Sequence, residues 1–496
     1  MRRAERAGGR RPGLHRLSWF ANGDHLDVAV VANRLAAAGR EVWRCPVASG
    51  EAEAGDYLVK VSGRLAEALR GAGIAIEPWA GARPADAQPV RHARIAVLAG
   101  EASAYPYYAY YALALARLGH AFAAVDGTAI AAGVLRGENI AVLPGGFSNW
   151  GLDAKEGSTG ADAAFRGFLA GGGAALASCG GAYYLSRGRP AWLGVADARP
   201  VFTQEYLRTG VGVVTCGLEP GPLRLGLPPT LEIPYFHGPV YDELGPGCAP
   251  IASFRERYDD GRLFIDNPLS EETFTRHMQG RVAALRASGR RGEAVLFSAH
   301  PEMGDLLRKY MALESYVPRY LPVRGALVMR ETLDSFAPAE SRSFLMILNA
   351  VEDLLRGARA GSPDGARAPD GARPSDDPSA AIRRLGEGWR TRRAAFRPSP
   401  GGIGDLERGL LAEFERRLDP ALRRLDDRLT RVAECGRDGP RIAVSFTAIA
   451  GHACAAWTDP PERRPGELLL ELELALLLIE AWARLAEIHA IVSTHD

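Results

Sequence analysis

The segment from Ala174 to Leu185 constrains the fold of this chain more than any other. It begins with a short apolar run that predicts a buried strand, and it continues through Cys179 into an apolar segment compatible with a helix. A strand, a sharp turn and a helix form the geometry in which a nucleophile lies exposed above the carboxyl edge of a sheet. Gly180 and Gly181 leave room at such a turn, where a Cβ would clash. The segment fits a buried structural cysteine at a tight turn equally well, so it does not show by itself whether Cys179 is a nucleophile.

The length and charge of the chain limit the classes of protein that it fits. At 496 residues it is longer than one ordinary domain, and we expect two or three. Lys and Arg number 60 against 59 Asp and Glu, so no overall field indicates a nucleic acid or a membrane as a partner. Residues 1–16 are locally basic and interspersed with glycine and proline, which predicts a flexible arm. No apolar core follows Arg2 and Arg3, so we expect no secretory signal.

The cysteines indicate a reducing environment. Six of them are scattered without a Cys-x-x-Cys pair, which argues against a zinc knuckle and against a disulfide framework. We therefore expect a cytoplasmic protein with no metal and no cofactor.

The first two thirds of the chain predict α/β architecture. Residues 17–85 have the pattern of a small α/β unit without a phosphate loop. From residue 92 on, continuous apolar runs such as Ile95–Leu98 and Ile140–Leu143 alternate with helical segments. This alternation predicts a mostly parallel sheet with flanking helices, in a domain that we place at residues 92–357.

The last third of the chain predicts helices. Residues 358–400 include a Pro/Gly/Asp-rich repeat and are expected to be a flexible linker. Residues 401–496 are expected to form a helical domain, with Pro420 beginning its second helix. The Leu-rich stretch Leu468–Ile488 contains charged residues that would be costly in lipid, so it predicts a buried or interfacial helix. This domain is the expected contact for a protein partner or a second copy of the chain.

Two further segments could line a pocket. Pro144-Gly145-Gly146 follows a predicted parallel strand, where backbone N–H groups suit an oxyanion hole, although the same residues fit a simple turn. The run Tyr235–Tyr241 could be a loop over a pocket, and His237 within it could be functional or structural.

The sequence His300-Pro301-Glu302 supports the nucleophile interpretation of Cys179. It follows the apolar strand Val295–Ser298, so both side chains can reach the sheet edge that carries Cys179. A cysteine nucleophile needs a base, and the base needs a carboxylate that fixes its tautomer and orientation.

Together, Leu143–Gly146, Cys179-Gly-Gly181 and Ser298–Glu302 resemble the three ordered motifs of the class I glutamine amidotransferases. Within that superfamily, the Gly-Gly-Ala-Tyr-Tyr continuation and the inserted β region resemble the biotin-protein ligase N-terminal domain family. The resemblance covers residues 92–357. It implies Cys179 as nucleophile, His300 as base and Glu302 as the residue that orients it. It also implies an oxyanion hole at Gly146 and Gly180, beside the candidate pocket residues Gly145, Gly181, Tyr183 and His237.

The implied reaction is attack on an amide or ester carbonyl of a small molecule or peptide, through a thioester. Two residues depart from the glutaminase pattern: Ala177 replaces a glycine, and Tyr183 stands where glutaminases usually have a glutamine. The loop typical of biotin ligase catalysis is not present, so we expect no ligase activity. The alternative interpretations are a non-catalytic ligand-binding or regulatory module with this fold, and a subunit that needs a partner.

Overall fold

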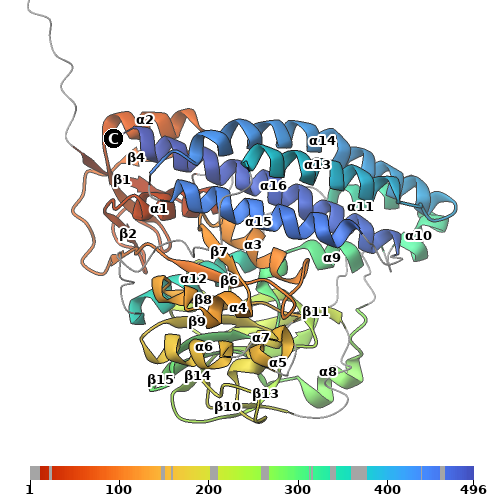
Figure 1. The fold of residues 1–496 in the computed structure, drawn as a ribbon, viewed down its shortest axis with the longest axis horizontal. Coiled ribbons are helices and arrows are strands. Elements are labelled where there is room, and N and C mark those ends of the chain that lie inside the picture. The colour runs from red at the N-terminus through yellow and green to blue at the C-terminus, as the bar shows by residue number, and fades with distance from the viewer. Residues whose placement is uncertain are drawn as a thin grey trace, which may run out of the picture.

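The protein consists of an α/β layer and a layer of long helices that lies across it (Figure 1). In the computed structural model, the described residues are 12–19, 21, 25–146, 151–157, 160–201, 211–258, 267–311, 313, 317–335, 342–358, 377–436, 438–458 and 464–495.

The N-terminal unit is an antiparallel sheet with two helices. Its strands lie in the order β4-β1-β3-β2-β5. The elements are β1 (Gly13–Leu17), α1 (His25–Ala37), β2 (Val42–Arg44), β3 (Tyr57–Val61), α2 (Gly63–Gly71), β4 (Ile76–Pro78) and β5 (Gln88–Pro89). Residues 13–16 of the expected flexible arm are therefore part of a strand, because pairing with β3 and β4 satisfies their backbone groups. Residues 1–11 lie outside the described residues.

The predicted mostly parallel core is confirmed. Five neighbouring strands run parallel, in the order β7-β6-β8-β9-β16. They are β6 (Ile95–Leu98), β7 (Phe122–Val125), β8 (Ile140–Leu143), β9 (Ala174–Ser178) and β16 (Gly292–Phe297). The strands β6, β8 and β9 are buried at every position, because helices cover both faces of the sheet.

Alternate residues of these strands belong to two separate apolar cores. Val97 and Val142 pack into one core with α3 (Tyr107–Arg117) and α12 (Ser343–Gly357). Leu98 and Leu143 pack into the other core, which faces the following helices. These are α4 (Gly127–Ala131), α5 (Leu152–Glu156), α6 (Ala161–Ala170) and α7 (Gly180–Leu185), together with the 3-10 turn η1 (Val134–Gly137).

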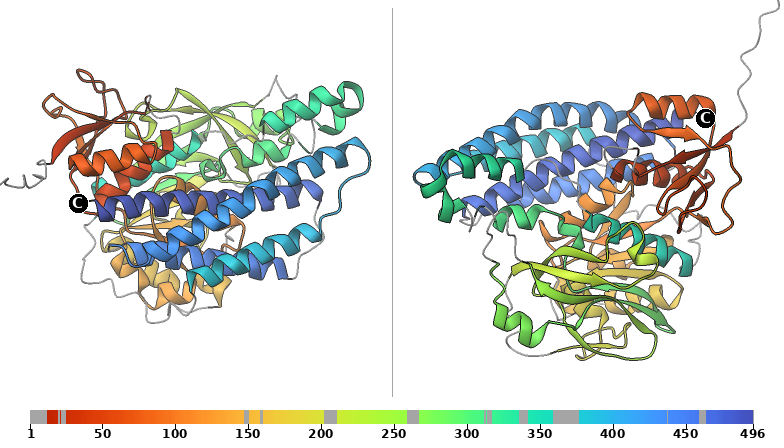
Figure 2. Two further views of the ribbon diagram at one scale, coloured as in Figure 1. Left: turned by 90° about the horizontal axis from the view of Figure 1, so that it is seen from above. Right: turned by 180° about the vertical axis from the view of Figure 1, so that it is seen from behind.

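An antiparallel region extends the sheet beyond β16. Its strands continue in the order β15-β14-β11-β12, with β10 and β13 paired beside them, and it is seen from behind in Figure 2. The elements are β10 (Ala198–Pro200), β11 (Val211–Leu218), η3 (Pro222–Arg224), β12 (Thr230–Phe236), β13 (Tyr241–Leu244), β14 (Cys248–Arg257), α8 (Glu271–His277) and β15 (Val282–Gly289). The end of β12 lies beside the end of the parallel core, because the His300 backbone N–H donates to the Pro234 carbonyl over 2.7 Å.

The helical layer contains α13 (Pro378–Ala394), α14 (Gly402–Val432), α15 (Gly439–Thr458) and α16 (Pro465–Thr494), which Figure 2 shows from above. The expected linker at residues 358–400 is thus helical over α13, because Ile382, Leu385 and Trp389 bury one face of that segment. Residues 359–376 lie outside the described residues. The expectation that Pro420 begins a new helix is wrong, because α14 continues through it. Its buried apolar stripe extends on both sides of the proline, and α16 contacts it at Arg417–Glu480 before the proline and at Arg428–Glu487 after it.

The Leu-rich helix α16 is covered by other parts of the same chain. It packs against α14, and it also contacts α3 and α1 below the helical layer. The short helices α9 (Leu306–Met311), α10 (Val317–Arg324) and α11 (Ala326–Ser335) connect the sheet to this layer. Among the described residues, no helix is long and apolar enough to span a membrane.

Candidate active site

Cys179 lies at a strained turn between β9 and α7. Its backbone has φ 49° and ψ −111°, and among the described residues only Cys179 and His237 are non-glycine residues with positive φ. Such a conformation costs about 1–3 kcal/mol and persists only where the surroundings enforce it. The close packing of α7 on β8 does so: a Cβ on Gly181 would lie 2.2 Å from the Leu143 carbonyl oxygen. A glycine at position 181 is therefore required by steric clearance at this turn.

His300 and Glu302 reach the same sheet edge because β16 lies beside β9. The two strands are parallel, with Phe297 opposite Ser178, so the chain leaves both at neighbouring points. Glu302 lies in the short 3-10 turn η4 (Pro301–Met303). The Nδ1 atom of His300 is 2.8 Å from Oε1 of Glu302, and both side chains are buried.

The pKa of His300 lies well above its ordinary value. Burial by itself would lower it, but the carboxylate of Glu302 and the adjacent Cys179 side chain outweigh burial. Glu302 thus favours the imidazolium form of His300, which is the form produced when the imidazole accepts a proton.

The backbone carbonyl of Phe236, at the end of β12, lies over both groups. The Cys179 thiol donates to this oxygen over 3.1 Å, and His300 Nε2 lies 3.3 Å from it. Cys179 is 8% exposed and His300 6% exposed, so this segment covers the nucleophile. Because the oxygen rather than the carbon of this carbonyl faces the sulfur, it acts as a hydrogen-bond acceptor.

The Gly145-Gly146 turn lies beside the pair. A Cβ on Gly145 would lie 2.6 Å from His300 Cε1 and 3.5 Å from Cys179 Cβ. Gly146 has φ +72°, and a Cβ there would meet the ring of Tyr107. The Gly145 carbonyl accepts a hydrogen bond from the Ser103 hydroxyl over 3.1 Å, which fixes the turn. Gly180 begins α7 directly after Cys179.

The remaining candidate pocket residues are placed differently. The ring of Tyr183 is buried against Trp192, with 5.6 Å between the ring centroids. His237 has φ 52°, and its ring lies 5.0 Å from that of Phe236 at the covering segment. Direct contact of either side chain with a substrate stays a prediction.

Two residues near the site were not predicted from the sequence. Ser178 donates a hydrogen bond to Oε2 of Glu302 over 3.0 Å, and the Tyr111 hydroxyl is 2.5 Å from the Ser178 oxygen. Ser178 could have been noticed as the residue before Cys179. Tyr111 is one of several tyrosines in α3, and no sequence signal distinguishes it from the others.

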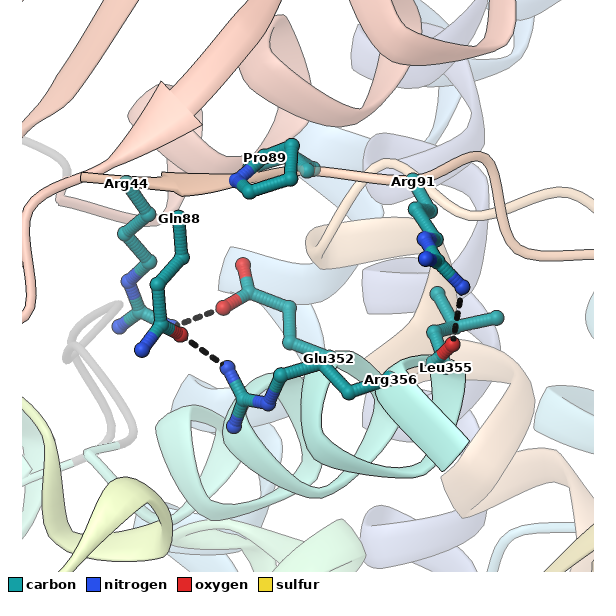
Figure 3. A pocket seen from close by; sticks show the side chains of 8 residues that line it. Arg44, Gln88, Pro89, Arg91, Glu352, Leu355 and Arg356 are labelled. Carbon is teal, nitrogen blue, oxygen red and sulfur yellow. Dashed lines mark hydrogen bonds and ion pairs between the residues drawn. The ribbon is translucent and has the colours of Figure 1, made fainter. Parts of the chain in front are cut away.

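A small cleft elsewhere contains none of these residues. It lies between the N-terminal sheet and α12, and Arg44, Arg91, Glu352 and Arg356 are among its lining side chains (Figure 3). Arg44 and Glu352 form an ion pair of 2.7 Å, so the charges at this cleft join two parts of the fold. In the described part of the chain, no group of three or more His, Cys, Asp or Glu side chains is arranged to hold a metal ion.

Comparison with known proteins identifies no family by sequence. No family model matches the chain, and no curated protein matches it. Similar solved structures include a putative GMP synthase subunit from Thermoplasma acidophilum, 12% identical, covering 54% of this chain and 96% of its own, with a TM-score of 0.33. A glutamine amidotransferase from Thermotoga maritima is 14% identical, covering 53% and 99%, with a TM-score of 0.32. Another glutamine amidotransferase is 20% identical, covering 44% and 96%, with a TM-score of 0.29. TM-scores at this level establish neither the fold nor the activity of the chain.

Proposed function

We propose that the protein is a cysteine-dependent hydrolase or amidotransferase of the class I glutamine amidotransferase-like superfamily. The observation that carries this proposal is the position of Cys179, on a strained strand–helix turn next to a buried His300–Glu302 pair. Strain of this kind is stored at functional sites, and a packed structural cysteine has no need of it. The finer assignment to the biotin-protein ligase N-terminal-like family, without ligase activity, rests on the sequence motifs alone.

In the proposed mechanism, the thiol proton of Cys179 moves to His300 Nε2, and Glu302 holds Nδ1 and stabilises the imidazolium. The sulfur then attacks the carbonyl carbon of an amide or ester. N–H groups near Gly146 and of Gly180 stabilise the negative oxygen of the tetrahedral intermediate. The bond to the leaving nitrogen or oxygen breaks, and His300 returns the proton to it. A thioester on Cys179 remains.

In the second half, water attacks the thioester carbon and gives a proton to His300. The carbon–sulfur bond breaks, His300 returns the proton to the Cys179 sulfur, and the acid product leaves. Ala177 and Tyr183 depart from the glutaminase pattern, so we propose a small amide, ester or peptide other than glutamine as the substrate. Binding of that substrate has to displace the Phe236 carbonyl from the sulfur.

The proposal is tested by acylation and alkylation of Cys179. p-Nitrophenyl acetate should leave an acetyl group on Cys179, located by peptide mass spectrometry, and iodoacetamide should modify Cys179 at pH 6 at least about 10-fold faster than N-acetylcysteine. His300→Ala should remove both effects. Cys216 is an internal control, because burial raises the pKa of its thiol to about 12. Absence of the acetyl adduct, with alkylation no faster than the model thiol and unchanged by His300→Ala, would contradict the enzymatic proposal.

A non-catalytic ligand-binding module is the second candidate. It is favoured by the Phe236 carbonyl, which occupies the hydrogen-bonding groups of both Cys179 and His300. This candidate predicts that no acetyl adduct forms and that Cys179→Ser changes neither folding nor any thermal shift caused by a ligand.

A further inference from the structure

The Glu302 carboxylate is held at both of its oxygens. Oε1 accepts from His300 Nδ1 over 2.8 Å, and Oε2 accepts from the Ser178 hydroxyl over 3.0 Å. The carboxylate is only 1% exposed, so these contacts replace water that a buried charge would otherwise need.

Tyr111 completes a chain of donors behind Glu302. Because the Ser178 proton points to Glu302, the Tyr111 hydroxyl donates to Ser178, over 2.5 Å. Burial, followed by the nearby Glu302 carboxylate, raises the pKa of Tyr111 well above its ordinary value, so the tyrosine keeps its proton. Tyr111 lies on α3, which packs against α16 and η4. The donor chain therefore connects the helical layer to the carboxylate at the site.

We propose that Ser178 and Tyr111 are positioning residues that hold Glu302 in line with His300. The proposal rests on the function proposed above, in which Glu302 orients the base. Without the Ser178 hydroxyl, the buried carboxylate loses one of its donors and can turn away from Nδ1. The attraction between Glu302 and His300 then weakens, and His300 becomes a poorer partner for the thiolate.

The chain offers a matched control at the other end of α7. Ser186 and Tyr241 form a second buried Ser–Tyr pair, 3.1 Å apart, in which Ser186 also donates to the Ala182 carbonyl over 2.7 Å. This pair has the same chemistry and burial, but its hydrogen bonds lead to a backbone carbonyl and not to Glu302. Ser186→Ala and Tyr241→Phe therefore report the cost of losing a buried Ser–Tyr hydrogen bond alone.

The test measures the His300 titration by NMR on protein with ¹³C-labelled histidine, with His300→Ala identifying the resonance. The titratable groups that face His300 are Glu302 and Cys179. In Ser178→Ala, the pKa of His300 should fall by about one unit, and Cys179 alkylation at pH 6 should slow about 10-fold. Tyr111→Phe should also lower the pKa of His300 and slow the alkylation of Cys179, but by smaller amounts. The two control variants should change neither.

Equal losses of melting temperature in all four variants, with an unchanged His300 titration in Ser178→Ala and Tyr111→Phe, would overturn the positioning role. The NMR titration does not depend on reactivity. If the wild-type Cys179 is unreactive but the His300 pKa still falls in Ser178→Ala, the proposed function fails while the positioning of Glu302 stands.

Discussion

Two regions of this protein bury histidine beside charged groups, and they shift its pKa in opposite directions. At the candidate site, His300 faces Glu302 and its pKa is raised. The second region, which we call the junction, contains Arg34, His92, His120 and Asp438, where α1 meets the start of α15. Burial, together with Arg34 and other positive groups, lowers the pKa of His92 to about 4 and that of His120 to about 3.

The two regions differ in the group that their buried carboxylate pairs with. Asp438 is paired with Arg34 at 3.0 Å, so it compensates a permanent cation, and His92 Nε2 is 3.6 Å away. Glu302 is directed at His300 by its own hydrogen bonds. Burial and a shifted pKa thus occur in both regions, and only the candidate site adds a nucleophile and a strained backbone. A candidate catalytic site is therefore indicated by the arrangement of its groups and not by the size of a pKa shift.

The largest expected effect comes from breaking the junction. Arg34→Met removes the hydrogen-bonded cation from the mostly buried Asp438, and the free energy of unfolding should fall by about 3–5 kcal/mol in a urea titration. Alkylation of Cys179 in the folded variant should keep the wild-type rate. The double variant Arg34→Met/Asp438→Leu should recover most of the loss. A slower Cys179 in the folded single variant would show that the two regions are coupled, against the comparison above.

The second prediction concerns a substitution that changes the candidate site and leaves the junction intact. In Gly145→Ala, the new Cβ would lie 2.6 Å from His300 Cε1, so the imidazole must shift. A displacement of this order should slow acylation of Cys179 by p-nitrophenyl acetate about 100-fold. Gly167→Ala is the control, because its Cβ meets nothing within 4 Å and it lies in a helix, where alanine is favoured. Equal rates of Cys179 acylation in both variants would show that Gly145 is not part of the candidate site.

The smallest effect is a pH dependence with opposite signs in the two regions. The lowered pKa of His120 means that its contribution to stability is complete above pH 6.5 and is lost as the pH falls toward about 3. Between pH 6.5 and 5, the free energy of unfolding should therefore fall by about 1.4 kcal/mol per pH unit for this histidine. His120→Gln should remove this part of the acid slope and leave the part due to His92. His300 has the reverse sign: its contribution is present below pH 6.5 and is lost as the pH rises through its raised pKa, so His300→Ala should leave the acid slope intact. An acid slope that survives His120→Gln at full size would contradict the assignment.

The sequence determined those features that depend on local steric rules. The glycines after Cys179 predict the tight turn, and at Gly181 a Cβ cannot fit. The apolar runs such as Ile140–Leu143 predict buried strands because both of their faces need cover. His300 and Glu302 are two residues apart, so their joint arrival at one sheet edge follows from where their strand ends.

Only the tertiary structure decided the contacts that join distant segments. Ser178 and Tyr111 are 67 residues apart, and the Phe236 carbonyl is 57 residues from Cys179. Their meeting depends on strand order and on the placement of α3 and β12, which no local pattern specifies. For the same reason, the sequence did not predict that α14 continues through Pro420: the α16 residues that contact it before and after the proline, Glu480 and Glu487, lie about sixty residues further along the chain.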